Sequence, residues 1–261
     1  LINTHHHFFQ AFVRNLLTID RPNLTVVGWL TEIYKTFRFI DSDVIYYASL
    51  ACMADLIKHG CTTVFDHQYC YTDATGTTPI DRQMEAADMM GIRFHAGRGV
   101  NTRPGSEPGS TMPNNDMCET TDTYIKDCER IISKYNDAER FAMKRIVLAP
   151  CQPINCYVET FTETMKLARS KNVHMHTHMC EGENKVMREI YGKRSIAWAE
   201  ELGLLGPDIW IAHGRETQPF EYSILANTGT GICHCPAATM LGATEPLDMP
   251  AMLKSGILLS L

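Results

Sequence analysis

The sequence predicts an α/β protein, and within that class a (β/α)8 barrel of the TIM type. Short apolar runs alternate with longer amphipathic stretches, there are eight such runs, and 261 residues suit one barrel. A doubly wound open sheet is the alternative, but no G-x-G-x-x-G motif follows any of the runs. The runs predict strands over residues 1–7, 62–66, 92–97, 145–150, 173–178, 209–213, 229–235 and 257–261.

Amphipathic stretches between most of these runs predict helices. Several end at a glycine, as at Gly60 and Gly91, which is typical of a helix C-terminus. Two stretches, 17–27 and 101–116, follow neither pattern, so we expect irregular loops that form either lids or mobile surface segments. The predicted helices cover residues 43–58, 79–90, 121–135, 158–171, 195–202, 220–226 and 249–254.

Composition narrows the classes of partner. The net charge is −6 and the pI is about 6.0, which argues against nucleic acid and anionic membranes as partners. There is no apolar run of about 20 residues and no signal peptide. The ten cysteines lack paired C-x-x-C spacing, so we expect free thiols in a cytoplasmic protein. Both ends fall within apolar runs, and we expect residues 1–261 to be a barrel domain truncated at both ends.

Histidines gather where the predicted strands end. His5 and His7 are two residues apart, which places both side chains on one face of a strand. His176 and His178 repeat this spacing, and His213 ends another strand. A single histidine on a strand is usually a buried structural residue. Together, at one end of a barrel, these residues predict a site for zinc or iron.

Glu181 follows His178 by three residues and is the candidate proton carrier. A water activated by a metal ion needs a base that takes its proton and later returns it to the leaving group. The alternative is a solvated glutamate that opens a helix beside Glu183. The neighbouring histidines favour the catalytic interpretation.

Eight short motifs follow one another along nearly the whole chain. They are Leu1-Ile2-Asn3-Thr4-His5-His6-His7 with Gln10, Gly60-Cys61-Thr62-Thr63, Asp66-His67, Arg93-Phe94-His95-Ala96, Leu148-Ala149-Pro150-Cys151, His176-Thr177-His178 with Glu181, Trp210-Ile211-Ala212-His213-Gly214 and His234-Cys235-Pro236. In this order they resemble the amidohydrolase superfamily. The resemblance is to the branch of cytosine and guanine deaminases, triazine hydrolases and 8-oxoguanine deaminase, and the last few motifs are most similar to 8-oxoguanine and isoxanthopterin deaminases.

The resemblance implies a role for each site residue. His5, His7 and His178 would be metal ligands, and His213 would contact the activated water or the substrate and in some members also binds the metal. Glu181 would shuttle the proton. His6 should point away from the metal and be structural.

The resemblance also implies further parts that this chain does not contain. A last ligand, an aspartate after strand eight, is expected beyond Leu261, and so is a small β-sandwich. Binuclear relatives carry a carbamylated lysine at the end of strand four. Here that strand ends at Pro150-Cys151-Gln152, with Lys144 at its start, so we expect one divalent ion. Zinc is preferred, with iron as the alternative.

The implied function is hydrolytic deamination of a small aromatic N-heterocycle, with release of ammonia after attack by a metal-activated hydroxide. The candidate rings are an oxidised purine such as 8-oxoguanine, a pterin such as isoxanthopterin, and a guanine- or cytosine-like ring. The alternatives are a triazine chlorohydrolase or alkylaminohydrolase on the same fold, and a noncatalytic metal-binding scaffold. A homo-oligomer is expected from the resemblance.

Six residues are candidates for recognising such a ring, each with a packing role as the alternative. Arg98 leads, because a guanidinium suits a carbonyl-rich ring. Ala237-Ala238-Thr239-Met240 and Cys151-Gln152-Pro153 depart from the pattern of 8-oxoguanine deaminases, which weakens the prediction of 8-oxoguanine itself. The six candidates are Gln10, Trp29, His67, Tyr69, Arg98 and Gln152.

Overall fold

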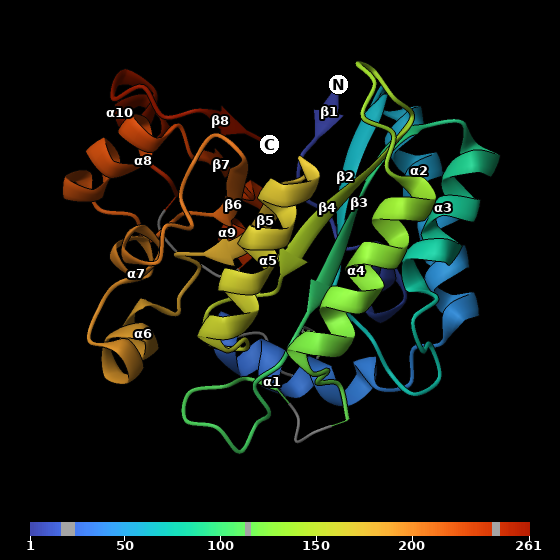
Figure 1. Ribbon diagram of the computed structural model, residues 1–261, viewed down its shortest axis with the longest axis horizontal. Coiled ribbons are helices and arrows are strands. Elements are labelled where there is room, and N and C mark those ends of the chain that lie inside the picture. Colours follow the sequence, from blue (N-terminus) through green and yellow to red (C-terminus); the bar gives the residue numbers. More distant parts are fainter. Residues whose placement is uncertain (17–23, 113–115, 242–245) are drawn as a thin grey trace.

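A computed structural model, which describes residues 1–16, 24–112, 116–241 and 246–261, contains one sheet of eight parallel strands (Figure 1). Each strand pairs with the next in sequence, so the spatial order is β1 to β8. The strands are β1 (Ile2–Asn3), β2 (Thr63–Gln68), β3 (Arg93–Val100), β4 (Lys144–Pro150), β5 (His174–Met179), β6 (Ile209–His213), β7 (Gly231–Cys233) and β8 (Leu259–Ser260).

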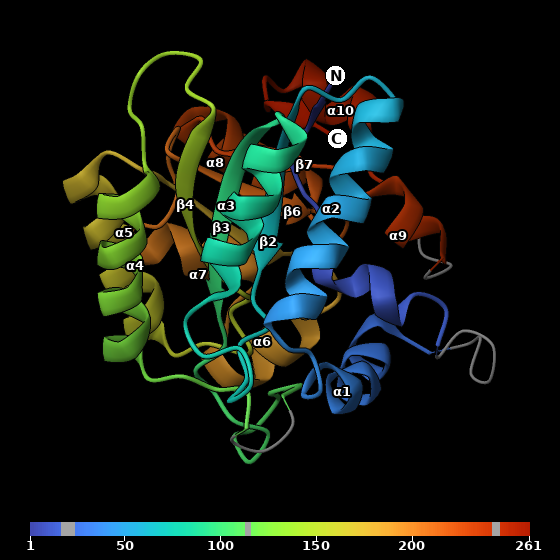
Figure 2. The ribbon, with the colours of Figure 1, turned by 90° about the vertical axis from the view of Figure 1, so that its right-hand side faces the viewer.

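The first and last strands meet, which curls the sheet into a barrel. The backbone N–H of Thr4 donates to the carbonyl oxygen of Leu261 at 2.9 Å. The hydroxyls of Thr4 and Ser260 lie 2.7 Å apart. Figures 1 and 2 accordingly place the two termini side by side. The predicted TIM-type barrel is confirmed.

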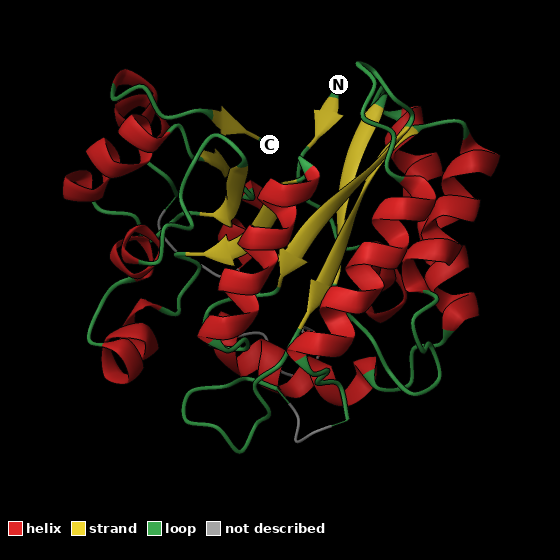
Figure 3. Cartoon of the chain, viewed as in Figure 1, coloured by secondary structure: helices red, strands yellow, loops and turns green. Residues whose placement is uncertain are grey.

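Helices cover the outside of the strands, and Figure 3 separates the two kinds of element by colour. The predicted ranges 79–90, 121–135, 158–171 and 249–254 agree with the observed helices. Helix α2 begins one residue earlier than predicted, because the Asp41 side chain caps it by accepting from Val44 N–H at 2.8 Å. The predicted helices are α2 (Ser42–Lys58), α3 (Pro79–Met90), α4 (Thr121–Tyr135), α5 (Val158–Lys171), α7 (Ser195–Glu201), α8 (Tyr222–Thr228) and α10 (Met249–Lys254).

Four elements of the described chain lie outside every predicted helix and strand. They are the 3-10 helix η1 (Phe8–Val13) and the helices α1 (Val26–Phe37), α6 (Asn184–Tyr191) and α9 (Pro236–Leu241). The expected loop at 17–27 is wrong from Val26 onward, since Thr25 caps α1 through a 3.1 Å hydrogen bond from Gly28 N–H; residues 17–23 lie outside the described residues. The loop at 101–116 is confirmed over 101–112, and 113–115 are not described.

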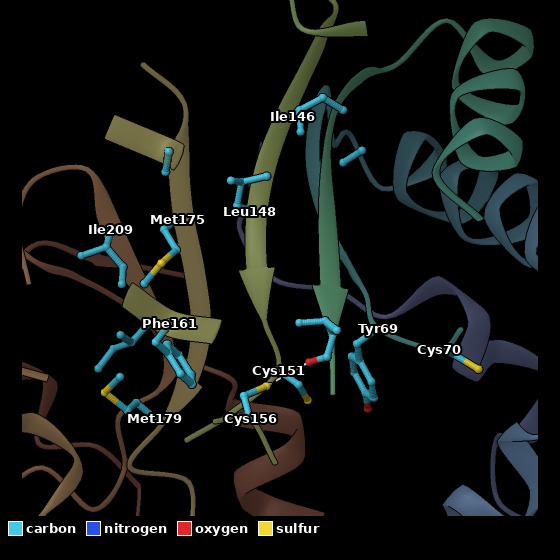
Figure 4. Packing of buried hydrophobic residues seen from close by; sticks show 14 of the residues in the cluster. Tyr69, Cys70, Ile146, Leu148, Cys151, Cys156, Phe161, Met175, Met179 and Ile209 are labelled. Atoms are coloured by element: carbon cyan, nitrogen blue, oxygen red, sulfur yellow. Dashed lines mark hydrogen bonds between the residues drawn. The ribbon is translucent and has the colours of Figure 1, made fainter. Parts of the chain in front are cut away.

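The main core lies between the strands and the surrounding helices. Alternate residues of each strand face outward, such as Leu148 of β4 and Met175 of β5, and both are fully buried. Figure 4 shows them in the same cluster as Phe161 of α5. Each such side chain stabilises the fold by about 1.5–3 kcal/mol through burial alone. This layer fixes the positions of the strand ends that carry the site.

A smaller apolar cluster forms from residues of the opposite strand face. It contains Phe65, Val147 and Ala149, with Trp210 packed against them. These residues alternate with the outward-facing ones, so they point into the barrel. The ten cysteines are all free, as predicted. Within the described residues, no helix combines the length and the apolar character needed to cross a membrane.

Candidate metal centre

Five histidine rings meet inside the C-terminal mouth of the barrel. His5 and His7 follow β1, His67 lies near the end of β2, and His178 and His213 lie at the ends of β5 and β6. The ring of His5 lies 4.6 Å from that of His7 and 4.9 Å from that of His178, measured between ring centres. Parallel strands therefore bring together the residues that the sequence motifs singled out.

A backbone carbonyl fixes which nitrogen of His5 is free. Nδ1 of His176 donates to the carbonyl oxygen of Trp210 at 2.9 Å, so Nε2 of a neutral His176 carries no proton. That Nε2 lies 2.9 Å from Nδ1 of His5 and accepts a hydrogen bond from it. The remaining Nε2 of His5 is buried and, among the described residues, has no hydrogen-bond partner.

The same argument applies to His7 and His178. Nδ1 of His7 donates to the carbonyl of His67 at 2.9 Å, and Nδ1 of His178 donates to the carbonyl of Cys151 at 2.7 Å. Both Nε2 atoms then carry lone pairs, and they face each other at 3.1 Å. Two unprotonated nitrogens at that distance repel each other unless a cation lies between them.

These residues fit a metal ion. Three groups of histidines have ligand atoms that all lie within 4.8 Å of one another: His5, His178 and His213; His7, His67 and His178; and His5, His67 and His176. Burial lowers the pKa of His178 to about 4, with a smaller lowering from His213. Burial also lowers the pKa values of His5 and His7 well below the ordinary value. Neutral imidazoles are the form that binds zinc or iron.

The predicted ligands are divided among these groups. His178 is shared by two of them, once with His5 and once with His7. His6, which was expected to be structural, is in none of the groups found in the described part of the chain; its Nδ1 accepts from His7 N–H at 2.9 Å. Lys144 pairs with Asp88 at 2.6 Å at the start of β4, far along the strand from the histidines.

Glu181 lies beside the histidine rings. Its Oε1 is 3.3 Å from Nε2 of His213, and its carbonyl accepts a hydrogen bond from Nε of Arg215. Burial raises the pKa of Glu181, and the charges of His178 and Arg215 only partly oppose this effect. The pKa of His213 is lowered to about 3, mainly by burial and to a smaller extent by the charges of Arg215 and His234. A carboxyl group with a raised pKa beside a neutral imidazole is suited to proton transfer near neutral pH.

Left-handed backbone surrounds the site. His213 has φ +73° and Cys180 has φ +56°, although neither is glycine. Gly214 follows with φ +64°, and a Cβ there would lie 2.9 Å from the side chain of Ile232. For residues other than glycine, such conformations cost about 1–3 kcal/mol each and concentrate at functional sites. The chain uses them here to turn sharply as it leaves β5 and β6.

Four of the predicted recognition residues lie in or beside this mouth. Nε2 of Gln10 donates to the Tyr69 hydroxyl at 3.0 Å, and the Tyr69 ring lies 5.1 Å from that of His7. Gln152 is buried, and its Nε2 has no partner in the described chain. Nε2 of His67 donates to the carbonyl of Ala149 at 2.8 Å, so its unpartnered Nδ1 is an acceptor. Trp29 packs against the main core, partly buried.

The prediction for Arg98 needs correction. Its side chain is fully buried, and its guanidinium lies 3.5 Å from the ring centre of Tyr71. Nε donates to Asp127 at 2.7 Å, and both terminal nitrogens donate to Glu119 at 2.8 Å. Every guanidinium nitrogen is therefore hydrogen-bonded within the protein, so the structure gives Arg98 a structural role. Sequence reasoning could not foresee these carboxylates, which come from 21 and 29 residues away.

Two residues have roles in the structure that the sequence did not predict. His176 belonged to the predicted histidine cluster but not to the implied ligands, and it orients His5. His67 was predicted only as a recognition residue, yet it belongs to two of the three histidine groups. No pattern in the sequence predicts which of its nitrogens is free, because that depends on the carbonyl of Ala149 across the barrel.

Comparisons with known proteins agree with the resemblance. Residues 1–261 match the amidohydrolase family. The chain is 51% identical over 257 residues to hydroxydechloroatrazine ethylaminohydrolase from Pseudomonas sp. (strain ADP), covering 98% of this chain and 53% of that protein. It is 31% identical over 242 residues to 8-oxoguanine deaminase from Pseudomonas aeruginosa, covering 92% and 53%. The resemblance read from the motifs is thereby confirmed.

Solved structures support the same fold. An atrazine chlorohydrolase from Arthrobacter aurescens, complexed with zinc, superposes with a TM-score of 0.89 at 27% identity, covering 99% of this chain and 58% of that one. The chain spans about half the length of the curated relatives it matches.

Proposed function

The chain belongs to the amidohydrolase family, and we propose that it hydrolyses the bond between a ring carbon and an exocyclic amine on a small aromatic N-heterocycle. The observation that carries this proposal is the set of inward-facing imidazole nitrogens beside the half-buried carboxyl of Glu181. A relative named as an ethylaminohydrolase and another named as a deaminase support the same bond class.

We propose one divalent ion at this centre, held by His5, His7 and His178, with His213 beside it. Zinc is preferred, since a structural neighbour was solved with zinc. When bound, such an ion supplies Lewis-acid activation of a water molecule at neutral pH. The absence of a lysine at the end of β4 supports one ion instead of two.

Glu181 moves the proton in this reaction. Its carboxylate accepts a proton from the attacking water while the oxygen forms a bond to the ring carbon, and it then gives that proton to the adjacent ring nitrogen. The second proton of the water leaves the new hydroxyl and goes to the departing amine as the carbon–nitrogen bond breaks. One water is consumed, one amine is released, and the ring carbon becomes a carbonyl. The raised pKa of Glu181 suits both halves of this transfer.

His213 holds the reacting atoms in place. Its Nε2 lies 3.3 Å from Glu181, and burial keeps its imidazole neutral. We propose that this ring orients the attacking oxygen and stabilises the negative charge that develops on it. The left-handed backbone at His213 gives the ring this direction.

Gln152 and His67 have free hydrogen-bonding atoms that suit an N-heterocycle. The buried Nε2 of Gln152 can donate to a ring nitrogen or carbonyl, and Nδ1 of His67 can accept a hydrogen bond. Tyr69, whose hydroxyl accepts a hydrogen bond from Gln10, presents an aromatic edge to this region. We propose that Trp29 lines the same region. Arg98 is not included.

Two substrate classes remain, and one relative favours each. Identity is higher to the protein named for hydroxydechloroatrazine than to the one named for 8-oxoguanine. We therefore favour a hydroxylated triazine with an alkylamino substituent, with an aminopurine or pterin as the second candidate. Rings of both classes contain a carbon that is bonded to a ring nitrogen and to an exocyclic amine.

A substrate panel with the zinc-loaded full chain tests the proposal. Hydroxylated ethylaminotriazines, chlorotriazines, aminopurines, pterins and aminopyrimidines are incubated in parallel, and ethylamine, ammonia and chloride are measured. Release of ethylamine or ammonia from at least one ring supports it, and the released amine identifies the class. Chloride alone would replace it with a chlorohydrolase, and no product from any ring would favour a noncatalytic scaffold.

A further inference from the structure

Glu183 binds the turn that carries Glu181. Its Oε1 accepts a hydrogen bond from Cys180 N–H at 2.6 Å, and its Oε2 accepts from Glu181 N–H at 2.8 Å and Gly182 N–H at 3.2 Å. One carboxylate therefore satisfies three consecutive backbone donors. The hydroxyl of Ser195 donates to Oε1 at 2.5 Å as a fourth bond.

The turn would not hold its shape without such partners. Cys180 has φ +56°, which is unusual for a residue with a side chain, and Gly182 has φ +153°. Strained backbone of this kind persists only where the surrounding structure stabilises it. Convergent N–H groups in a tight turn form a concave site for an anion, and here the anion is a side chain of the same segment.

A second set of bonds holds Glu183 itself. Glu183 as a whole is only 2% exposed. Asn184, the next residue, accepts from Ser195 N–H at 2.8 Å through its Oδ1 and donates to Glu216 at 2.9 Å through its Nδ2. Ser195 opens α7 and binds the Glu183 carboxylate directly, while Glu216 in the loop after β6 holds the neighbouring Asn184. Burial raises the pKa of Glu183, and the hydrogen bonds it accepts oppose this effect.

We propose that Glu183 is a positioning residue that fixes the turn at 180–182 and so directs the carboxyl of Glu181 toward His213. This inference rests on the proposed function, in which Glu181 moves the proton. Glu183 does not touch the reacting atoms. It acts through the backbone N–H of Glu181, one residue from the strained Cys180.

The variant Glu183→Gln keeps the size of the side chain and replaces one acceptor oxygen with an NH2 group. That NH2 would face backbone donors, so the turn loses at least one bond. We expect kcat to fall roughly 10- to 100-fold, a part of the 10²–10⁴ that a well-placed proton carrier contributes. KM and zinc content should each change by less than about twofold relative to the unaltered chain. The matched control is Glu189→Gln, an exposed glutamate of α6, which should behave as the unaltered chain.

Four measurements on the full chain decide the outcome: kcat, KM, zinc content and the thermal unfolding temperature. An unchanged kcat in Glu183→Gln, or an equal loss in Glu189→Gln, overturns the positioning role. If Glu183→Gln does not fold, Ser195→Ala replaces it, because it removes one bond to Oε1 and leaves the carboxylate; kcat should then fall measurably, and an unchanged kcat overturns the role.

Failure of the inference can be told from failure of the proposed function. Glu181→Gln is measured beside the other variants. If that change abolishes turnover while Glu183→Gln has none of the expected effect, only the positioning role is wrong. If Glu181→Gln leaves turnover unchanged, the proposed proton carrier is wrong, and the role of Glu183 fails with it.

Discussion

Backbone carbonyls select the tautomers of the buried histidines. Trp210 and Cys151 accept from the Nδ1 atoms of His176 and His178, and Ala149 accepts from Nε2 of His67. Each of these rings has one proton, since burial lowers its pKa. The nitrogen opposite the carbonyl is therefore the one that can bind a metal ion or accept a hydrogen bond.

The variant Glu181→Gln tests the proton carrier at the level of one residue. The amide has the same shape but cannot take a proton from water, so we expect turnover to fall by roughly 10²–10⁴-fold. Zinc content should not change, because the histidines are untouched. Stopped assays of amine release, together with metal analysis, measure both. Turnover within twofold of the unaltered chain would remove Glu181 from the mechanism.

Gln152→Met tests whether the unpartnered amide recognises substrate. An unsatisfied buried polar group costs about 1–3 kcal/mol, so an apolar side chain of similar length should leave stability unchanged or raise it. Substrate binding should weaken, with KM raised about tenfold for the loss of one hydrogen bond. Kinetics and thermal unfolding give the two readouts. A lower unfolding temperature with an unchanged KM would mean that Gln152 is structural.

The sequence motifs were sufficient to find the histidines that converge where the strands end, although β1 is only Ile2–Asn3, so His5 and His7 follow it and do not lie on one strand as predicted. His5, His7, His178 and His213 are brought together because parallel strands end at one face of the barrel. Spacing was insufficient for Arg98, whose partners Glu119 and Asp127 lie in other elements. Polar contacts between distant segments depend on the packed structure, so they could not be read from the local pattern.

At the scale of the elements, Asp81 ties α3 to α4. Its carboxylate accepts from Arg130 and Lys134 at 2.8 Å and from the Tyr135 hydroxyl at 2.6 Å. Partial burial alone would raise the pKa of Asp81, but the three donors outweigh it and lower the pKa to about 2. One residue in the first turn of α3 thus contacts three residues of the neighbouring helix.

Asp81→Asn should destabilise the chain in a pH-dependent way. Because folding lowers the pKa of Asp81, its contribution is complete above about pH 4 and is lost as the pH falls toward about 2. At pH 7 we expect a loss of about 1 kcal/mol, since the partners are partly exposed. Denaturant unfolding from pH 2 to 7 measures this. Glu129→Gln on α4 is the control. If the loss of unfolding free energy in Asp81→Asn were the same at every pH, the role given to the Asp81 carboxylate would be contradicted.

The sequence predicted the bounds of α3 and missed α6, and the two helices show why. The range of α3 follows from Pro79 at its start and Gly91 after its end. Helix α6 has eight residues and lies beside the strained turn, where Glu183 and Asn184 have tertiary partners. Its formation depends on those contacts, which the sequence pattern does not contain.

For the whole molecule, a metal ion would join strands from opposite parts of the barrel. His5 and His7 follow β1, while His178 lies on β5. An ion bound to both regions therefore stabilises the closed barrel against the unfolded chain. At a free zinc concentration 100 times the dissociation constant, the gain is about 2.7 kcal/mol.

Metal removal should lower the thermal unfolding temperature of the full chain. Calorimetry before and after dialysis against a chelator measures the shift, and readdition of zinc should restore it. His178→Ala should abolish the shift, because His178 is shared by two of the histidine groups. His59→Ala, an exposed histidine at the end of α2, is the control. An equal response to zinc in His178→Ala would place the metal elsewhere.

The most direct test of the central claim follows the oxygen atom. The zinc-loaded full chain is incubated in ¹⁸O-labelled water with the ring that reacts best in the panel, and the products are analysed by mass spectrometry. We predict one ¹⁸O atom on the ring carbon for each molecule of amine released. Amine release without ¹⁸O in the ring, or ¹⁸O incorporation without amine release, would contradict hydrolysis of the carbon–nitrogen bond at this centre.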